Sequence, residues 1–373
     1  MSASEATAFI LFFGRAGLSD LEMRLDAVRI AIAASVLRRA RQAGFTPLIA
    51  VARDAEAVRA FRDAGAEAIP ERTDPFHLGQ ELAAIARERG LERICCIGAG
   101  AGALLDAQDL RAMREELEAA EGLVLSNNYY SADLVAFTPA SALDAIALPA
   151  TDNPLPRLLH QEGGLRSKQL PRSAATLLDV DTPADATVLV RHPGCPEELR
   201  HLLTWEAELG PRIDALMQLI TTAERELLVA GRVGAPVWTY LESQTACRVR
   251  MLAEERGMQA AGRDASGSAR TALGFLYERT GPAEFFARMA ELGDGMLFDS
   301  RVLFAHLGWR PGAAERFASD LFDADRAGHE LAAFTEAARD ARIPVLLGGH
   351  TLVSGVLWTM VEAAWSGHPE PAD

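Results

Sequence analysis

The chain has 373 residues, of which 49% are hydrophobic and 24% are charged. This length exceeds what one hydrophobic core usually organises, and the composition is that of a globular protein, so we expect about two domains and no long disordered region. The surplus of 52 acidic over 37 basic residues gives a net charge of −15. Such a charge repels phosphate backbones and anionic lipids, and we therefore expect neither a nucleic-acid nor a membrane partner.

Targeting and cross-linking signals are also missing from the sequence. No run of roughly 18 consecutive apolar residues is present, as a membrane-spanning helix would need. Residues 1–8 lack the basic region and cleavage site of a secretory signal, so a cytoplasmic protein is expected. The four cysteines lack zinc-type spacing and predict neither zinc nor disulfides. A homo-oligomer is compatible with this composition.

In chain order, apolar runs alternate with helical periodicity over the first half of the sequence. The first predicted strand, 8–13, is followed by the turn Gly14-Arg15-Ala16-Gly17 and a helix at 25–43. The alternation continues with strands at 47–52, 67–69, 92–97, 122–126 and 133–137, and with helices at 54–64, 77–89, 106–120 and 139–146. Continuous apolar strands between amphipathic helices predict an α/β fold, a three-layer Rossmann-like and mostly parallel sheet.

After about Pro193 the pattern becomes helical, which predicts an all-α domain at 193–373 after the α/β domain at 1–192. One late strand is expected at 343–347, before Gly348-Gly349 and a final helix. The predicted helices of this half are 197–209, 212–230, 236–256, 266–279, 282–292, 297–307, 313–320 and 329–341.

The most specific motif is Leu-Leu-Asp-Val-Asp-Thr-Pro-Ala-Asp at 177–185. A strand at this point would deliver Asp179 and Asp181 to the same side of the pleat, followed by a Thr-Pro helix start with Asp185 in its first turn. Paired carboxylates at a strand end can hold Mg²⁺ and, through it, nucleotide phosphates. Equally, Asp181 is explained as a helix cap and Asp179 as a solvated side chain.

This motif, at the end of a region of about 190 residues, resembles the closing motif of nucleotidyltransferases of the molybdenum-cofactor guanylyltransferase and phospholactate guanylyltransferase type. The resemblance covers about residues 8–192 and implies a nucleotide-diphospho-sugar transferase type of sheet, similar to that of GT-A glycosyltransferases. It further implies that Asp179 and Asp181 support Mg²⁺, that Asp181 acts in catalysis, and that Gly14, Arg15 and Gly17 hold the nucleotide.

The sequence departs from this family after the strand at 92–97. Where the family has a metal-binding aspartate, this chain reads Gly98-Ala99-Gly100-Ala101-Gly102-Ala103, and Asp106 is the nearest acid and the candidate replacement ligand. Gly98, Gly100 and Gly102 could let backbone N–H groups approach phosphate. A turn of small residues packed under a helix explains the same letters.

Two further segments supply candidate binding residues. The string 126–133 is dense in hydrogen-bonding groups, and we take Asn127, Asn128 and Asp133 as candidate substrate contacts, although Asn-Asn is equally a good turn. Lys168 is the only lysine of the chain and follows Gly163-Gly164, as in a mobile phosphate-binding loop, so it is a candidate catalytic residue. An ordinary solvated loop is the alternative.

In the second half, Gly348-Gly349-His350-Thr351 joins a strand to a helix and could take an anion, or could be a helix cap and a packed histidine. Asp299-Ser300-Arg301 and His306 are most simply read as a polar helix face.

Three functions follow. The first is transfer of a nucleotidyl group from a purine nucleoside triphosphate to a small phosphorylated acid or sugar phosphate. The second is a non-catalytic sensor or scaffold that binds a nucleotide or sugar phosphate without the metal site. The third is a sugar-nucleotide-dependent glycosyltransferase, for which Asp179 and Asp181 form the only Asp-x-Asp pair in a suitable place. Fold-level resemblance is a weak basis for choosing among them.

Overall fold

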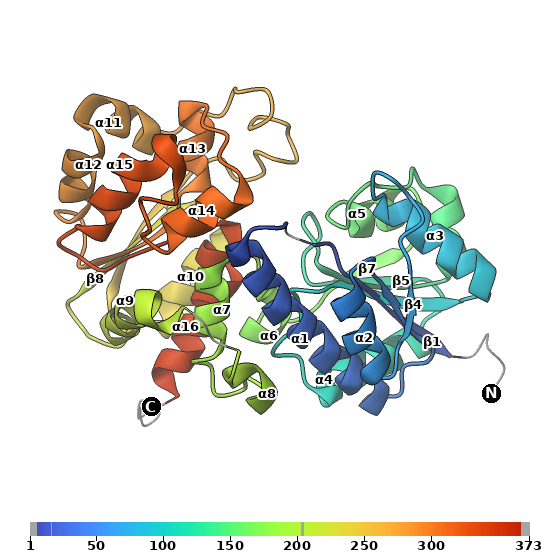
Figure 1. The fold of residues 1–373 in the computed structure, drawn as a ribbon. Helices are drawn as coiled ribbons and strands as arrows, with labels where there is room; N and C mark the ends of the chain where they lie inside the picture. Colours follow the sequence, from blue (N-terminus) through green and yellow to red (C-terminus); the bar gives the residue numbers. More distant parts are fainter. Residues whose placement is uncertain (1–5, 16, 203–204, 367–373) are drawn as a thin grey trace. The chain divides into compact units, whose positions relative to one another are not determined.

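The computed structural model describes residues 6–15, 17–202 and 205–366 (Figure 1). Its internal contacts divide the chain into two compact units. The first unit comprises residues up to Arg15 and Arg29–Asp179, and the second comprises Ala16–Val28 and the chain from Val180 onward. Helix α1 (Asp20–Gln42) therefore contributes to both units. The assignment of functional domains to 1–192 and 193–373 stays a prediction.

The first unit is built on a seven-stranded sheet in the order β3-β2-β1-β4-β6-β5-β7. Every neighbouring pair is parallel except those that involve β6, which runs against β4 and β5. This confirms the predicted mostly parallel α/β fold. The strands are β1 (Thr7–Phe12), β2 (Leu48–Val51), β3 (Glu67–Ile69), β4 (Arg93–Gly98), β5 (Leu123–Ser126), β6 (Leu134–Thr138) and β7 (Arg166–Gln169).

Helices cover both faces of this sheet, because its central strands are apolar on both sides (Figure 1). Ile10 and its same-face neighbours pack against α3 and α5, whereas Phe9 and Leu11 point to the opposite face. The segment 163–168, expected as a mobile loop, instead leads into the edge strand β7. The remaining helical elements of the unit are α2 (Ala55–Asp63), α3 (Leu78–Arg89), α4 (Ala107–Glu118), η1 (Ala140–Ala145), α5 (Leu155–Gln161) and α6 (Ala174–Leu177).

The strand order contains a switch point between β1 and β4. The chain adds β2 and β3 on one side of β1 and then returns to place β4 on the other side. The connections that leave the carboxyl ends of β1 and β4 therefore diverge, and such a divergence is where parallel sheets usually bind ligands.

The second unit is helix-rich, as expected, but it also contains a four-stranded parallel sheet in the order β11-β10-β8-β9. The prediction of an all-α domain with one late strand is thus corrected. Only β11 was expected, since its apolar run stood alone between breakers. The strands are β8 (Glu226–Gly231), β9 (Arg248–Ala253), β10 (Gly295–Asp299) and β11 (Val345–Gly348).

The three missed strands overlap segments that the sequence pattern assigned to helices: β9 lies within the predicted helix 236–256, and β8 and β10 overlap the predicted helices 212–230 and 297–307. Each has only five or six residues. β8 and β10 are short apolar runs, which fit a buried strand and a helix segment equally well, and β9 contains two arginines and no buried residue. Phe298 packs with Phe285 and Phe334 on one face, and Gly295 lies against Leu216 and Leu219 of α9 on the other.

The helices of this unit lie on both sides of its sheet, as Figure 1 shows. They are α7 (Pro183–Leu189), α8 (Glu197–Arg200), α9 (Glu206–Ile220), α10 (Ala235–Gln244), α11 (Ala272–Thr280), α12 (Pro282–Met289), α13 (Arg301–Leu307), α14 (Ala313–Asp320), α15 (Gly328–Arg339), η2 (His350–Val353) and α16 (Gly355–Trp365).

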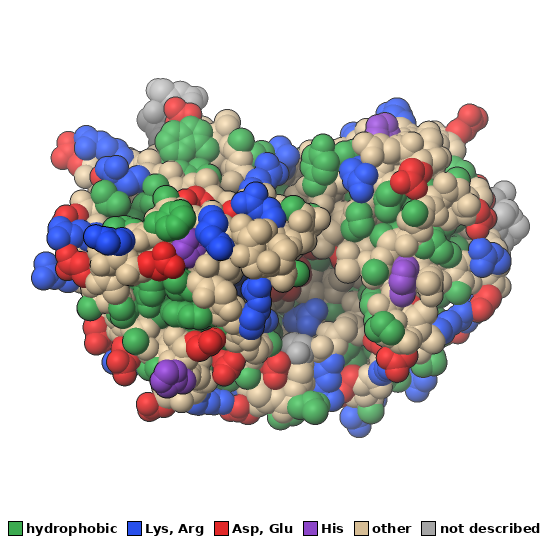
Figure 2. All heavy atoms as spheres, turned by 90° about the horizontal axis from the view of Figure 1, so that it is seen from above, with side chains coloured by type: hydrophobic (Ala, Val, Ile, Leu, Met, Phe, Trp, Pro, Cys, Tyr) green, Lys and Arg blue, Asp and Glu red, His purple; other side chains and the backbone are tan. Residues whose placement is uncertain are grey.

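Within the described ranges, no helix combines the length and the apolar character needed to cross a membrane. On the face drawn in Figure 2, acidic and basic side chains are interspersed and do not gather into one field of a single sign.

Candidate functional site

The loop after β4 is a compact turn at the switch point of the large sheet. The Gly98 N–H donates to the Asp133 carbonyl (3.0 Å), and the Ala101 N–H donates to the Gly98 carbonyl (3.2 Å). Gly102 has a φ of +75°, and a Cβ there would lie 2.9 Å from Ile97 Cδ1, so only glycine fits. Residues 99–103 are buried, whereas Gly98 is half-buried with open space beside it. Of the three glycines predicted to hold phosphate, Gly98 is the one that a ligand can approach.

Asn127 orders the connection between β5 and β6 and does not face outward. Its side-chain carbonyl accepts from the backbone N–H groups of Asp133 (3.1 Å) and Leu134 (3.2 Å), and its amide donates to Asp133 Oδ2 (3.2 Å). Asn128 accepts from the Tyr130 N–H, as in an Asx turn. The asparagines therefore hold the loop, and Asn127 fixes the half-buried Asp133 at the edge of the sheet.

Asp179 lies next to the same loop. It forms an isolated antiparallel bridge with Ala101 and is half-buried, so the predicted strand at 177–181 reduces to this single bridge after α6. Asp133 and Asp179 thus flank one turn at residues 98–101. The sequence pattern pointed to Asp179 through its motif, but it gave Asp133 no metal role, because the pairing of β4 with β6 is not visible in the sequence.

The other residues predicted to hold nucleotide or metal have local structural roles. Arg15 forms an ion pair with Asp54 (3.2 Å), and the Gly14 carbonyl accepts from Arg29 (3.1 Å). Asp106 caps α4 by accepting from the Gln108 and Asp109 N–H groups. The ammonium of Lys168 bonds the Glu116 carboxylate at 2.7 Å on the edge strand.

Gly17 and Asp181 belong to the second unit. A Cβ at Gly17 would lie 2.2 Å from Glu22 Oε1, so a carboxylate, and not an anion site, packs against this glycine. Asp181 is exposed and directly precedes Thr182, the cap of α7. The catalytic roles of Lys168 and Asp181 stay predictions.

Asp133 and Asp179 suit a magnesium ion better than a transition metal. Among the described residues, no group of three or more His, Cys, Asp or Glu side chains could hold a metal ion. Mg²⁺, however, commonly takes one or two carboxylates and completes its shell with substrate phosphates and water. Two half-buried acids beside an accessible Gly98 match that pattern, and Mg²⁺ itself stays a prediction.

Sequence reasoning also missed a polar group near the β5–β6 connection. Ser131 donates to Asn153 (2.6 Å), and the ring of Tyr129 contacts that of His160 edge to face at 5.9 Å.

Cys96 is a buried core residue of β4. Burial and the charge of Asp152 together raise the pKa of its thiol to about 12.

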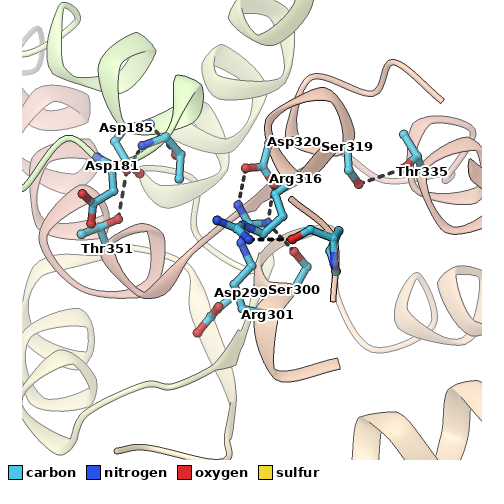
Figure 3. A network of polar contacts seen from close by, with 12 residues as sticks. Asp181, Asp185, Asp299, Ser300, Arg301, Arg316, Ser319, Asp320, Thr335 and Thr351 are labelled. Atoms are coloured by element: carbon cyan, nitrogen blue, oxygen red, sulfur yellow. Dashed lines mark hydrogen bonds and ion pairs between the residues drawn. The ribbon is translucent and has the colours of Figure 1, made fainter. Parts of the chain in front are cut away.

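The second unit contains a buried polar network at the carboxyl edge of its own sheet (Figure 3). Arg232 bonds Asp299 through Nε (2.6 Å) and Nη2 (3.0 Å), and Arg301 bonds Asp320 through Nη1 (2.8 Å) and Nη2 (2.6 Å). Burial would raise the pKa of Asp299, but the surrounding groups, Arg232 first among them, together outweigh burial and lower that pKa. The expected polar helix face is therefore a buried set of ion pairs.

Asp185 extends this network toward η2. Its Oδ2 accepts from the N–H groups of Asp181 (3.0 Å) and Thr182 (2.8 Å) and from the Thr351 hydroxyl (3.0 Å), whereas its Oδ1 is buried without a hydrogen bond in the described structure. Burial and the neighbouring Asp181 raise the pKa of Asp185 to about 7. This carboxyl group is therefore partly protonated near neutral pH.

No family model and no curated protein match this sequence. Solved structures similar to part of the chain include a putative nucleotide-diphospho-sugar transferase from Desulfovibrio desulfuricans, with 18% identity, 50% of this chain and 87% of that chain covered, and a TM-score of 0.37. A cytidylyltransferase from Leptospira borgpetersenii has 14% sequence identity, with 56% of this chain and 96% of that chain covered, and a TM-score of 0.40.

A third similar structure is a CMP:2-keto-3-deoxy-manno-octonic acid synthetase complexed with CTP, with 16% identity, 48% of this chain and 95% of that chain covered, and a TM-score of 0.35. At these values the likeness is to the fold alone. These three names include nucleotidyl-transferring enzymes, but none is a guanylyltransferase of the molybdenum-cofactor or phospholactate type.

Proposed function

We propose that the first unit binds a nucleotide at the carboxyl edge of its seven-stranded sheet and acts as a nucleotidyltransferase. The substrates would be a purine nucleoside triphosphate and a small phosphorylated acid or sugar phosphate. The observation that carries this proposal is the pair Asp133 and Asp179, which flank the turn 98–101 at the switch point between β1 and β4.

Each residue of this edge would have its own role in the reaction. Asp133 and Asp179 would hold Mg²⁺, and Asn127 would keep the Asp133 carboxylate in place through its amide. When bound, Mg²⁺ neutralises charge that develops at the α-phosphate. The open side of Gly98 would let the triphosphate lie close to the backbone. An acceptor oxygen then forms a bond to the α-phosphorus, the bond to the bridging oxygen breaks, and pyrophosphate leaves with that electron pair.

Pyrophosphate release from each nucleoside triphosphate, with Mg²⁺ and a panel of phosphorylated acids and sugar phosphates, tests the proposal. We expect Asp133→Asn and Asp179→Asn each to lower turnover on the order of 100-fold, because each removes a charge that positions the ion. Asp144→Asn is the matched control, since Asp144 is an exposed partner of Arg87 at the other end of the strands. Full turnover in both edge variants would contradict the assignment of these acids.

A nucleotide sensor is the second candidate, and the run Gly98 to Ala103 favours it, because this run contains no acid and 99–103 are buried. A sensor would be stabilised by a nucleotide without Mg²⁺ and would release no pyrophosphate. A glycosyltransferase would instead release a nucleoside diphosphate from a sugar nucleotide, and the same assay with sugar nucleotides separates that function from the other two.

A further inference from the structure

The small sheet of the second unit has a switch point of its own. From β8 the chain adds β9 on one side, and it then crosses back to place β10 and β11 on the other side. The connections after β8 and β10 therefore diverge at the carboxyl edge, where open parallel sheets place ligands. All four connections at this edge supply a charged or titratable residue: Arg232 after β8, Arg256 after β9, Asp299 at the end of β10 and His350 after β11.

Arg232 and Asp299 are buried at this carboxyl edge of the small sheet. Gly231 has a φ of +124°, and a Cβ there would lie 2.4 Å from the Asp299 Cβ, so the two strands approach more closely than any other residue would permit. Asp299 is fully buried and both of its oxygens accept from Arg232. Arg232 is only 7% exposed, yet its Nη1 has no hydrogen-bond partner within the described part of the chain.

His350 and Arg256 add two more polar side chains to this edge. Neither side chain makes a hydrogen bond or an ion pair with any described residue. Burial lowers the pKa of the His350 imidazole, and the charges of Arg232 and Arg256 act in the same direction against that of Asp299. Two guanidinium groups thus act on one imidazole, and Arg256 forms no ion pair with the acids that the structure describes.

The start of α10 lies beside these side chains. The Arg256 Cζ is 3.6 Å from the position that a Cβ of Gly234 would occupy, so the guanidinium lies against the first turn of the helix. No side chain caps α10. Pro236 has no N–H and the Val237 N–H donates to the Gly234 carbonyl (3.0 Å), so the donor that this turn can offer is the Ala235 N–H.

The donors at this edge are therefore the Arg232 Nη1, the Arg256 guanidinium, the His350 imidazole and the Ala235 N–H. Three acids at this edge already have partners: Asp299 pairs with Arg232, Glu254 accepts from the Ala272 N–H, and Glu255 pairs with Arg263.

We propose that this set of residues, Arg232, Gly234, Arg256 and His350, binds the phosphate group of a small molecule. A phosphate has several acceptor oxygens and suits a site that offers planar guanidinium donors and an N–H at the start of a helix. The site lies wholly within the second unit, is distinct from the proposed nucleotide site of the first unit, and does not depend on that function.

Titration of the full chain with inorganic phosphate, without Mg²⁺ and followed by calorimetry, tests this proposal. The wild-type protein should bind phosphate, and Arg256→Gln should raise the dissociation constant by about tenfold or more, since a charge-assisted hydrogen bond is lost. Arg248→Gln is the matched control: Arg248 is also an exposed arginine of the same sheet, but it begins β9 and thus lies at the opposite edge. Its dissociation constant should equal that of the wild type.

Asp133→Asn keeps this phosphate site intact if the proposal is correct, because Asp133 belongs to the first unit. A carboxylate repels phosphate when no Mg²⁺ is present, so tighter binding in that variant would place the phosphate beside Asp133 in the first unit and overturn the proposal. The proposal would also be overturned if the wild type did not bind phosphate, or if Arg256→Gln bound it as tightly as the wild type. The same holds if Arg248→Gln weakened binding as much as Arg256→Gln, or if chloride at the same ionic strength bound equally well. Failure of this test leaves the pyrophosphate assay unaffected, so the two proposals fail separately.

Discussion

Asp185 shows how one capping residue can also become a titrating group. Thr182, Pro183 and Asp185 begin α7 with a reciprocal capping box, which the letters Thr-Pro-Ala-Asp predict directly. The cost of burying this carboxylate beside Asp181 was not predictable, because it depends on η2 and α16 closing over it from more than 160 residues away. The same holds for Asp299, which the sequence pattern placed on a polar helix face and the structure places at the end of a buried strand.

Stability should therefore depend on the protonation of Asp185. The pKa of this group is raised in the folded state to about 7, so its protonation stabilises the fold fully below about pH 4 and the contribution is lost as the pH rises through 7. In Asp185→Asn the fall in the free energy of unfolding between pH 5 and pH 8 should be smaller by about 2–3 kcal/mol.

Urea denaturation at pH 5, 6.5 and 8 measures this difference. Asp144→Asn, at an exposed position, should keep the wild-type pH dependence. If Asp185→Asn loses as much stability between pH 5 and pH 8 as the wild type, Asp185 is not the titrating group.

At the scale of elements, the sequence pattern predicts the strands and helices of the first unit more accurately than those of the second. Long alternations of apolar strands and amphipathic helices predicted the elements of the large sheet, except for the short exposed strand β7. In the second unit, β8, β9 and β10 were absorbed into predicted helices. Their strand character depends on partners that are distant in sequence, and a run of five or six residues carries too little periodicity to indicate it.

The close approach of β8 and β10 gives a test of this element pairing. Gly231→Ala should destabilise the protein by about 1–3 kcal/mol more than Gly257→Ala, because overpacking is added to the backbone strain. Both glycines have positive φ values, but only Gly231 faces the Asp299 side chain, whereas Gly257 has no heavy atom within 4 Å of an added Cβ. Equal losses of unfolding free energy in urea would contradict the observed contact of these strands.

At the scale of the whole molecule, composition and periodicity predict an α/β region followed by an all-α one; the first is present, whereas the second is helix-rich but contains a four-stranded sheet. Composition and periodicity could not predict the strand orders, because the side of the sheet on which a strand pairs depends on contacts between residues that are distant in sequence. For that reason Asp133 was assigned to substrate and Asp106 to metal. The order β1-β4-β6 brings Asp133 to the turn after β4, while Asp106 caps a helix.

Nucleotide binding at the carboxyl edge of the large sheet is the central claim, and amide hydrogen exchange localises it most directly. The full chain would be compared with and without Mg²⁺ and each purine nucleoside triphosphate. We expect slower exchange in 98–105 and 127–134 when nucleotide is present, and loss of that protection in Asp179→Asn. Protection confined to the second unit, or unchanged exchange in both segments at saturating nucleotide, would contradict the account.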